Sequence, residues 1–187
     1  GGAMAGRVIY IVRSWPRLSQ TFIVNEVLAL ERRGLELSVF SLVRSGEPVV
    51  QPQVADVRAP VHYLDGPEQR GVRDLRRQLS WFVTAPVRTL LALWYCLRRP
   101  GLAAGYGECS ALRCLAHAVR VAAALEDLRA AGDEPVHVHA HFAHDPALVG
   151  MFVARLTGLP FTFTAHARDL FEIPATSLAA RAHAATA

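Results

Sequence analysis

Short apolar runs alternate with longer amphipathic stretches along the whole chain. The runs are rich in β-branched and aromatic residues, which is typical of buried parallel strands. They occupy residues 7–13, 36–42, 61–64, 136–140 and 161–165. Residues 19–34, 146–157 and most of 67–131 instead favour helices. This order predicts an α/β fold, a doubly wound, Rossmann-like parallel sheet with flanking helices.

Local signals predict where the helices begin and end. Ser19 or Thr21 can cap the free N–H groups of the first helix, and Gly34 can end it. Pro86 suits the first turn of a later helix, which Pro100 would end. The long helical region is therefore expected to consist of several separate helices.

The stretch from Leu79 to Leu97 has a single charged residue, Arg88. Its nineteen residues are nominally enough to cross a bilayer. Pro86 and the Arg98-Arg99 pair argue against a span, and the favoured interpretation is two core helices. A pair of helices lying on a membrane surface is the alternative.

Length and composition indicate a globular protein with one domain. The chain has 187 residues, of which 52% are hydrophobic and 19% charged, so residues 1–187 can bury a sizeable core. Residues 1–3, before Met4, resemble an expression remnant. All 20 basic residues are arginines, which excludes Schiff-base chemistry and a P-loop lysine within this chain.

The net charge of +4 fits a mildly basic soluble domain, and it also fits attraction to anionic lipid or to phosphate-bearing substrates. The arginines are scattered, so we expect no nucleic-acid partner. Cys96, Cys109 and Cys114 match no zinc spacing. They predict reduced thiols in a cytoplasmic protein, which could lie peripherally on the inner face of the membrane.

Three loops are expected to meet at the carboxyl edge of the sheet, where open α/β sheets bind ligands. The first, residues 13–21, lacks G-x-G-x-x-G, so Rossmann-type dinucleotide binding is disfavoured. It does bring a helix N-terminus to the edge, which attracts phosphate or hydroxyl oxygens. An ordinary capped loop is the alternative.

The second loop follows a strand in which His137, His139 and His141 alternate with apolar residues, so they project from one face. A metal site is disfavoured because Cβ atoms on one face of a strand are ~7 Å apart. We expect His141 and His144 to face the cleft. His137 and His139 would lie under covering helices as hydrogen-bonded core histidines.

The third loop contains His166 at the end of a buried strand, followed by Arg168 and Asp169. A titratable histidine in this place is a candidate for a functional site. The alternative is that a neighbouring carbonyl satisfies His166 and that Asp169 only caps the following helix.

Across these loops the chain resembles the retaining glycosyltransferases of family GT4, which have the GT-B fold, and in particular the exopolysaccharide and colanic-acid type. Residues 16–26 fit the pattern P-x-x-S-E/Q-T-F-x-x-N-E, with Gln20 where Glu is commoner. Residues 137–171 and the helical region before them complete the resemblance. Together these segments cover most of the chain in the order and spacing of the family.

The resemblance implies an N-terminal, acceptor-binding domain of a hexosyltransferase with two Rossmann-like domains. His166 would hydrogen-bond the donor sugar and Asp169 would lie nearby, as candidate catalytic residues. The substrate-binding candidates are Ser19, Gln20, Thr21, His141, His144 and Arg168. Transfer would proceed by same-face attack assisted by the leaving diphosphate, with the protein supplying positioning and positive charge.

The expected partners are a nucleotide-sugar and a saccharide or lipid-linked acceptor. No cofactor or metal is expected, which agrees with the lack of an Asp-x-Asp motif. The donor domain and a further strand would lie beyond Ala187, so we expect the chain alone to be inactive and to pair with a second copy through an exposed sheet edge. A stand-alone α/β ligand-binding module without transferase activity is the alternative.

Overall fold

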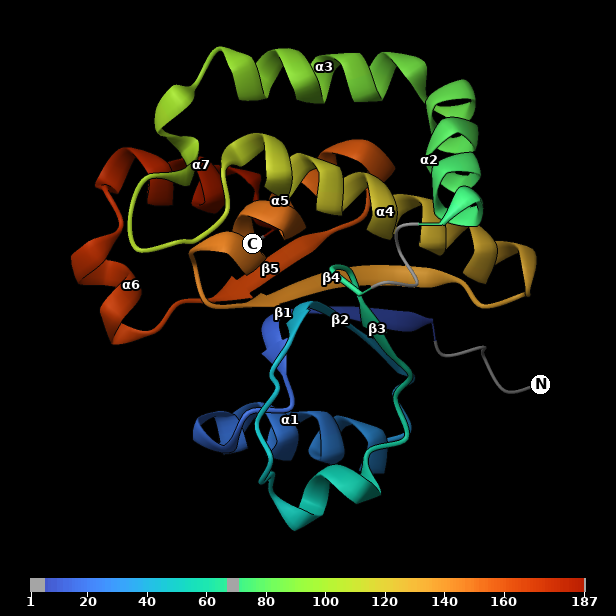
Figure 1. The fold of residues 1–187 in the computed structure, drawn as a ribbon, viewed down its shortest axis with the longest axis vertical. Helices are drawn as coiled ribbons and strands as arrows, with labels where there is room; N and C mark the ends of the chain where they lie inside the picture. Colours follow the sequence, from blue (N-terminus) through green and yellow to red (C-terminus); the bar gives the residue numbers. More distant parts are fainter. Residues whose placement is uncertain (1–5, 67–70, 187) are drawn as a thin grey trace.

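The computed structural model describes residues 6–66 and 71–186, and the expectations for residues 1–3 and 67–70 lie outside it (Figure 1). Five parallel strands form one sheet in the order β3-β2-β1-β4-β5. They are β1 (Arg7–Trp15), β2 (Leu37–Arg44), β3 (Val61–Tyr63), β4 (Pro135–His141) and β5 (Phe161–Thr164). The predicted α/β, Rossmann-like parallel sheet is confirmed in this general form.

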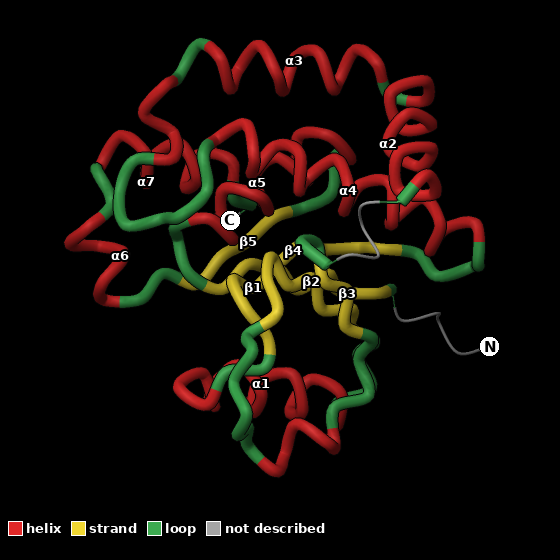
Figure 2. Tube along the Cα trace, viewed as in Figure 1, coloured by secondary structure: helices red, strands yellow, loops and turns green. Residues whose placement is uncertain are grey.

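Helices cover the two faces of the sheet unequally (Figures 1 and 2). One face carries α1 (Thr21–Arg32) and a short 3-10 helix (Pro52–Asp56). The other carries α2 (Val72–Thr84), α3 (Pro86–Leu97), α4 (Ala111–Ala130), α5 (Asp145–Thr157) and α7 (Ala175–Ala184), while α6 (Ala167–Glu172) lies beside the carboxyl end of β5. Helices α4 and α5 lie next to the sheet, and α3 forms a further layer outside them.

Two apolar cores follow from the alternation of side chains along the strands. In β1, Ile9 and Ile11 belong to the large core with α4 and α5. Tyr10 and Val12 belong to the smaller core with α1. Because both faces of β1 are covered, the strand is apolar almost throughout, as expected for a central parallel strand.

The face that α1 covers is apolar at β1 and β2 but polar at β4 and β5. Val138 and Ala140 of β4 point into the large core. His137 and His139 lie on the opposite face, half-buried, where both rings form hydrogen bonds with the Thr162 hydroxyl of β5. The predicted hydrogen bonding of these two histidines is confirmed, but they are only half-buried, not core residues.

The region between β1 and α1 differs from the prediction. Strand β1 continues to Trp15, and a 3-10 helix (Leu18–Gln20) precedes α1. The N-cap residue of α1 is Gln20, and no side chain caps the helix. The prediction that Ser19 or Thr21 is the cap is wrong, because the intervening 3-10 turn uses the Thr21 hydroxyl to donate a hydrogen bond to the Leu18 carbonyl.

The apolar stretch 79–97 is divided between α2 and α3, which meet at Ala85. None of the helices in the described part of the chain is long and apolar enough to cross a bilayer. The prediction that both are core helices is confirmed only for the sides of α2 and α3 that face the protein. Trp81, Ala92 and Cys96 are buried, whereas the outer sides of both helices expose large apolar residues.

Strand β5 forms one edge of the sheet. Near the start of this edge the Thr186 N–H donates a 2.7 Å hydrogen bond to the Phe161 carbonyl. Pairing of a second copy along β5 stays a prediction.

Candidate functional site at the carboxyl edge of the sheet

A pocket of about 490 Å³ opens at the carboxyl ends of β1, β2 and β4. This is where the strand order reverses, because the chain builds β2 and β3 on one side of β1 and β4 and β5 on the other. Its lining residues come from five segments that are distant in sequence: Arg13, Ser14, Arg17, Gln20, Val43, Arg44, Ser45, Tyr106, Glu108, Phe142, His144 and Arg168. A smaller cavity of about 380 Å³ at the opposite edge contains none of the predicted site residues.

Arginine is the commonest charged residue of the pocket lining. Four lining residues are arginines and one, Glu108, is acidic. Arg13 is paired with Glu108, Arg17 with Glu47 and Arg168 with Glu172, which offsets much of this charge. Arg44 lies over the Tyr63 ring at 3.8 Å and has no acidic partner among the described residues. Arg168 lies over the Tyr106 ring at 4.2 Å. Such a lining suits phosphate or another anionic group.

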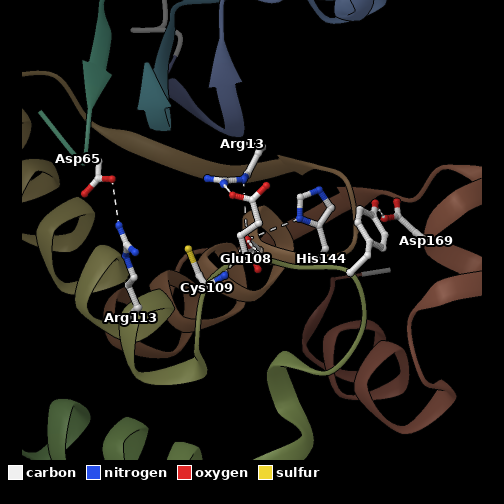
Figure 3. A network of polar contacts seen from close by, with 9 residues as sticks. Arg13, Asp65, Glu108, Cys109, Arg113, His144 and Asp169 are labelled. Carbon is white, nitrogen blue, oxygen red and sulfur yellow. Dashed lines mark hydrogen bonds and ion pairs between the residues drawn. The ribbon is translucent and has the colours of Figure 1, made fainter. Parts of the chain in front are cut away.

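Arg13 lies at the pocket together with Glu108 and His144 (Figure 3), and the buried Asp145 lies next to it. Arg13 forms an ion pair with Glu108, and its Nε lies 3.9 Å from Asp145 Oδ2. The same oxygen accepts the Glu108 N–H at 2.9 Å. Burial alone would raise the pKa of Asp145, but the neighbouring His144 and the hydrogen bond from the Glu108 N–H lower it. A buried, ionised carboxylate therefore holds the pocket's arginine and histidine in place.

Asp169 joins three loops at the side of the pocket. Its Oδ2 accepts the N–H groups of Ala143 at 3.0 Å and of His166 at 2.7 Å. Its Oδ1 accepts the Tyr106 hydroxyl, and burial and this contact raise the pKa of that phenol. The Asp169 side chain is fully buried and does not line the pocket. Its place in the structure is that of a positioning residue.

A second cluster lies on the α1 side of the sheet and consists of Tyr10, Glu26, His139, His141 and His166. Glu26 accepts the Tyr10 hydroxyl at 2.5 Å and lies 3.3 Å from His141 Nε2. These contacts, with His141 first, lower the pKa of Glu26 to about 2. Burial lowers the pKa of His139 to about 4. His141 is only 1% exposed and does not line the pocket, contrary to its predicted place in the cleft.

Phe142 separates the pocket from this cluster. Its ring centroid lies 5.6 Å from that of His144 on the pocket side and 4.4 Å from that of His166 on the other. Its φ of 75° is the only positive value at a non-glycine residue in the described part of the chain. A left-handed backbone at a bulky residue costs about 1–3 kcal/mol and is often found at functional sites.

No protein-family model, curated protein or solved structure matches this chain. Its function is therefore inferred from the geometry and charge of the pocket and the neighbouring cluster.

The predicted site residues divide between these places. Gln20, His144 and Arg168 line the pocket. His166 is half-buried beside Phe142, and burial lowers its pKa. Ser19 and Thr21 lie nearby without lining the pocket; Ser19 is exposed, and the Thr21 hydroxyl accepts a hydrogen bond from Gln51 at 2.9 Å.

Sequence reasoning missed several pocket residues. Arg44 and Ser45 follow the second strand, and a general expectation about carboxyl ends could have indicated them. Tyr106 and Glu108 come from the loop before α4, and nothing in their local sequence marks them.

Two groups of side chains could hold a metal ion among the described residues. In each group the ligand atoms lie within 4.8 Å of one another. One is Glu26, His139 and His141, and the other is Cys109, Cys114 and Asp145. The three cysteines are free and buried, and contacts with Cys114 and His117 lower the pKa of the Cys109 thiol. The expectation that the protein uses no metal stays a prediction.

We predict that Asp169→Ala lowers the free energy of unfolding by at least about 3 kcal/mol, because three donors lose their acceptor and unsatisfied buried groups cost roughly 1–3 kcal/mol each. Urea unfolding measures this loss. The matched control is Glu172→Ala in the same helix, whose exposed ion pair with Arg168 should contribute less than about 1 kcal/mol. Equal losses in the two variants would contradict the role of Asp169 as the acceptor that holds these three donors.

We also predict that stability falls as the pH drops from about 6.5 toward 5. The pKa of His139 in the folded state, about 4, lies below its ordinary 6.5, so the unfolded chain takes up a proton that the folded chain does not. His139→Gln should flatten this slope in urea unfolding, whereas His183→Gln, at an exposed position of α7, should leave it unchanged. An unaltered slope in His139→Gln would rule out this assignment.

Proposed function

We propose that this chain is the acceptor-side domain of a retaining glycosyltransferase that moves a sugar from a nucleotide-sugar to a saccharide or lipid-linked acceptor. The observation that carries the proposal is the arginine-lined pocket at the carboxyl edge of the sheet. The first, second and third loops of the resemblance all contribute to it, through Gln20, His144 and Arg168. The three loops that the sequence predicted as ligand-binding thus each contribute a residue to one cavity.

The chemistry of the pocket favours an acceptor that carries phosphate. Arg44 has no acidic partner among the described residues, so its guanidinium can bind two phosphate oxygens. Arg168 donates hydrogen bonds to Glu172 through Nε and Nη2, so only its Nη1 is left for a ligand. Arg13 is held by Glu108 and Asp145, and its Nη1 is buried without a hydrogen-bond partner among the described residues. The ring of Phe142 and the phenol of Tyr106 add apolar surface on which a sugar ring can pack.

His166 is proposed to contact the donor sugar. Its Nε2 is buried without a hydrogen-bond partner among the described residues, so it is available to a sugar hydroxyl. Its backbone is fixed by Asp169 and its ring by Phe142 and Phe22. During transfer the bond between the sugar carbon and the diphosphate oxygen breaks. The acceptor hydroxyl forms the new bond on the same face and gives its proton to the leaving diphosphate.

The pocket also fits a second candidate function, a binding module for phosphorylated saccharides that performs no transfer. The same arginines would hold the same ligand in that case. The two candidates differ only in whether the bound saccharide is extended when a nucleotide-sugar is supplied to the whole protein.

We predict that the chain binds a saccharide carrying a short-chain prenyl diphosphate and does not bind the same saccharide without diphosphate. The double variant Arg44→Gln/Arg168→Gln should weaken binding at least about tenfold, because each lost charge-assisted hydrogen bond is worth roughly 1.5–3 kcal/mol. Isothermal titration calorimetry measures the affinities. Arg129→Gln at the far end of α4 removes one charge outside the pocket and should bind normally. Equal affinity for both saccharides would exclude the diphosphate site.

In the protein as its gene encodes it, His166→Ala should lower kcat for sugar transfer roughly a hundredfold, because a positioned hydrogen-bond donor is lost. The melting temperature should change little, since the ring is only half-buried. The product is measured by mass spectrometry with several nucleotide-sugars and the diphosphate-linked acceptor. His183→Ala is the matched control. Turnover unchanged by His166→Ala would remove this residue from the site, and binding without any product would favour the binding module.

A further inference from the structure

Exposed apolar side chains are concentrated on α2 and α3. Of seventeen exposed large hydrophobic residues in the described part of the chain, ten belong to this helix pair. They are Val72, Leu75, Leu79, Phe82, Val83, Val87, Leu90, Leu91, Trp94 and Leu97. The remaining seven are scattered over six other segments. Large contiguous apolar patches are rare on soluble monomers and indicate an interaction surface.

Helix α3 shows the reverse of the usual arrangement of a surface helix. Its buried residues are the small ones, Thr89, Ala92 and Cys96. Its exposed side carries Leu90, Leu91, Trp94 and others, at 56–66% exposure. Since α3 is the outermost layer above α4 and α5, this side faces away from the sheet (Figure 1). A helix that is apolar all round is typical of a buried or membrane-bound helix.

Helix α2 continues this surface. Residues 72, 75, 79, 82 and 83 recur at helical spacing and form one exposed stripe. Asp74 and Trp81 lie on the side that faces the protein and are buried. The apolar stripe is therefore additional to the side with which α2 packs against α4.

The charge of the helix pair is almost entirely positive. Residues 71–99 contain six arginines and one acidic residue, Asp74. Asp74 is 6% exposed and paired with Arg120 at 3.3 Å, so it does not offset the surface charge. Arg77 is paired with Asp127 of α4, and Arg88 donates a hydrogen bond to the Leu156 carbonyl, so these two arginines contribute less to the outer surface. Arg98 lies over the exposed Trp94 ring at 5.0 Å, and Arg99 lies over Tyr95 at 4.5 Å. Arginine beside aromatic rings is an arrangement suited to the boundary between lipid tails and headgroups.

We propose that the outer surface of α2 and α3 binds the surface of a bilayer that contains anionic phospholipids. The apolar stripes would enter the boundary between headgroups and tails, and the arginines would contact lipid phosphates. A second copy of the chain is a poor occupant, because it would bring a second set of arginines against the first with no exposed carboxylate on either helix. This inference does not depend on the proposed sugar transfer, since vesicle binding involves a surface and not the pocket.

The test is flotation of the purified chain with vesicles of phosphatidylcholine alone and with phosphatidylglycerol added. We expect binding to the anionic vesicles, weakened by salt and by about fivefold for each arginine removed in Arg98→Gln and Arg99→Gln. Leu90→Ser/Leu91→Ser/Trp94→Ser should lower the partition at least about a hundredfold, because it removes most of the inserted apolar area of α3. The control Val49→Ser/Leu112→Ser/Phe171→Ser removes three exposed apolar residues elsewhere and should bind normally.

Tryptophan fluorescence provides a second readout on the same samples. Trp94 is 56% exposed, whereas Trp15 and Trp81 are 3% and 5% exposed, so a blue shift on adding vesicles would report Trp94 leaving water. Trp94→Phe should keep most of the binding and lose the shift. Circular dichroism checks that each variant is folded.

Three results would overturn the proposal. The folded chain could fail to float with either vesicle, or it could bind both equally. It could also form a dimer in analytical ultracentrifugation that the α3 triple variant dissociates, which would assign the surface to a second copy.

Discussion

Parallel pairing of all five strands is the constraint from which most of this structure follows. Parallel strands require crossovers, and the crossovers place helices on both faces, so central strands such as β1 are apolar on both sides. The same pairing sends every strand's carboxyl end to one edge. Polar side chains that would be costly in the core therefore gather in the loops there, and the pocket forms where the strand order reverses.

The sequence predicted what depends on local pattern. Each strand and the stop at Gly158 could be located because alternation and turn residues act over a few neighbours. The pocket could be predicted as a place but only partly as a set of residues. Tyr106 and Glu108 belong to it through contacts with residues distant in sequence, Asp169 and Arg13, which no short pattern records. His141 was expected to face the cleft, but it is 1% exposed and lies beside Glu26 and Tyr10 of the α1 side.

Asp169 illustrates the difference between a conspicuous residue and its role. A carboxylate after a strand-end histidine resembles catalytic machinery, yet its oxygens are occupied by Ala143, His166 and Tyr106. Asp169 nevertheless matters to the proposed chemistry. Its hydrogen bonds fix the backbone of His166 and the Tyr106 ring over which Arg168 lies. The pocket and the outer surface of α2 and α3 involve different residues, so the two proposals can be tested separately.

The histidines on the α1 side of β4 affect which pairing register this strand can adopt in the sheet. Along β4, Val138 and Ala140 lie in the large core, while His137, His139 and His141 lie on the other face. A slip of β4 by one residue would exchange these sets and bury three imidazoles against α4 and α5. Such a misfolded sheet would be penalised at every position of the strand. The histidines thus help to exclude wrong pairings during folding, whatever ligand the protein binds.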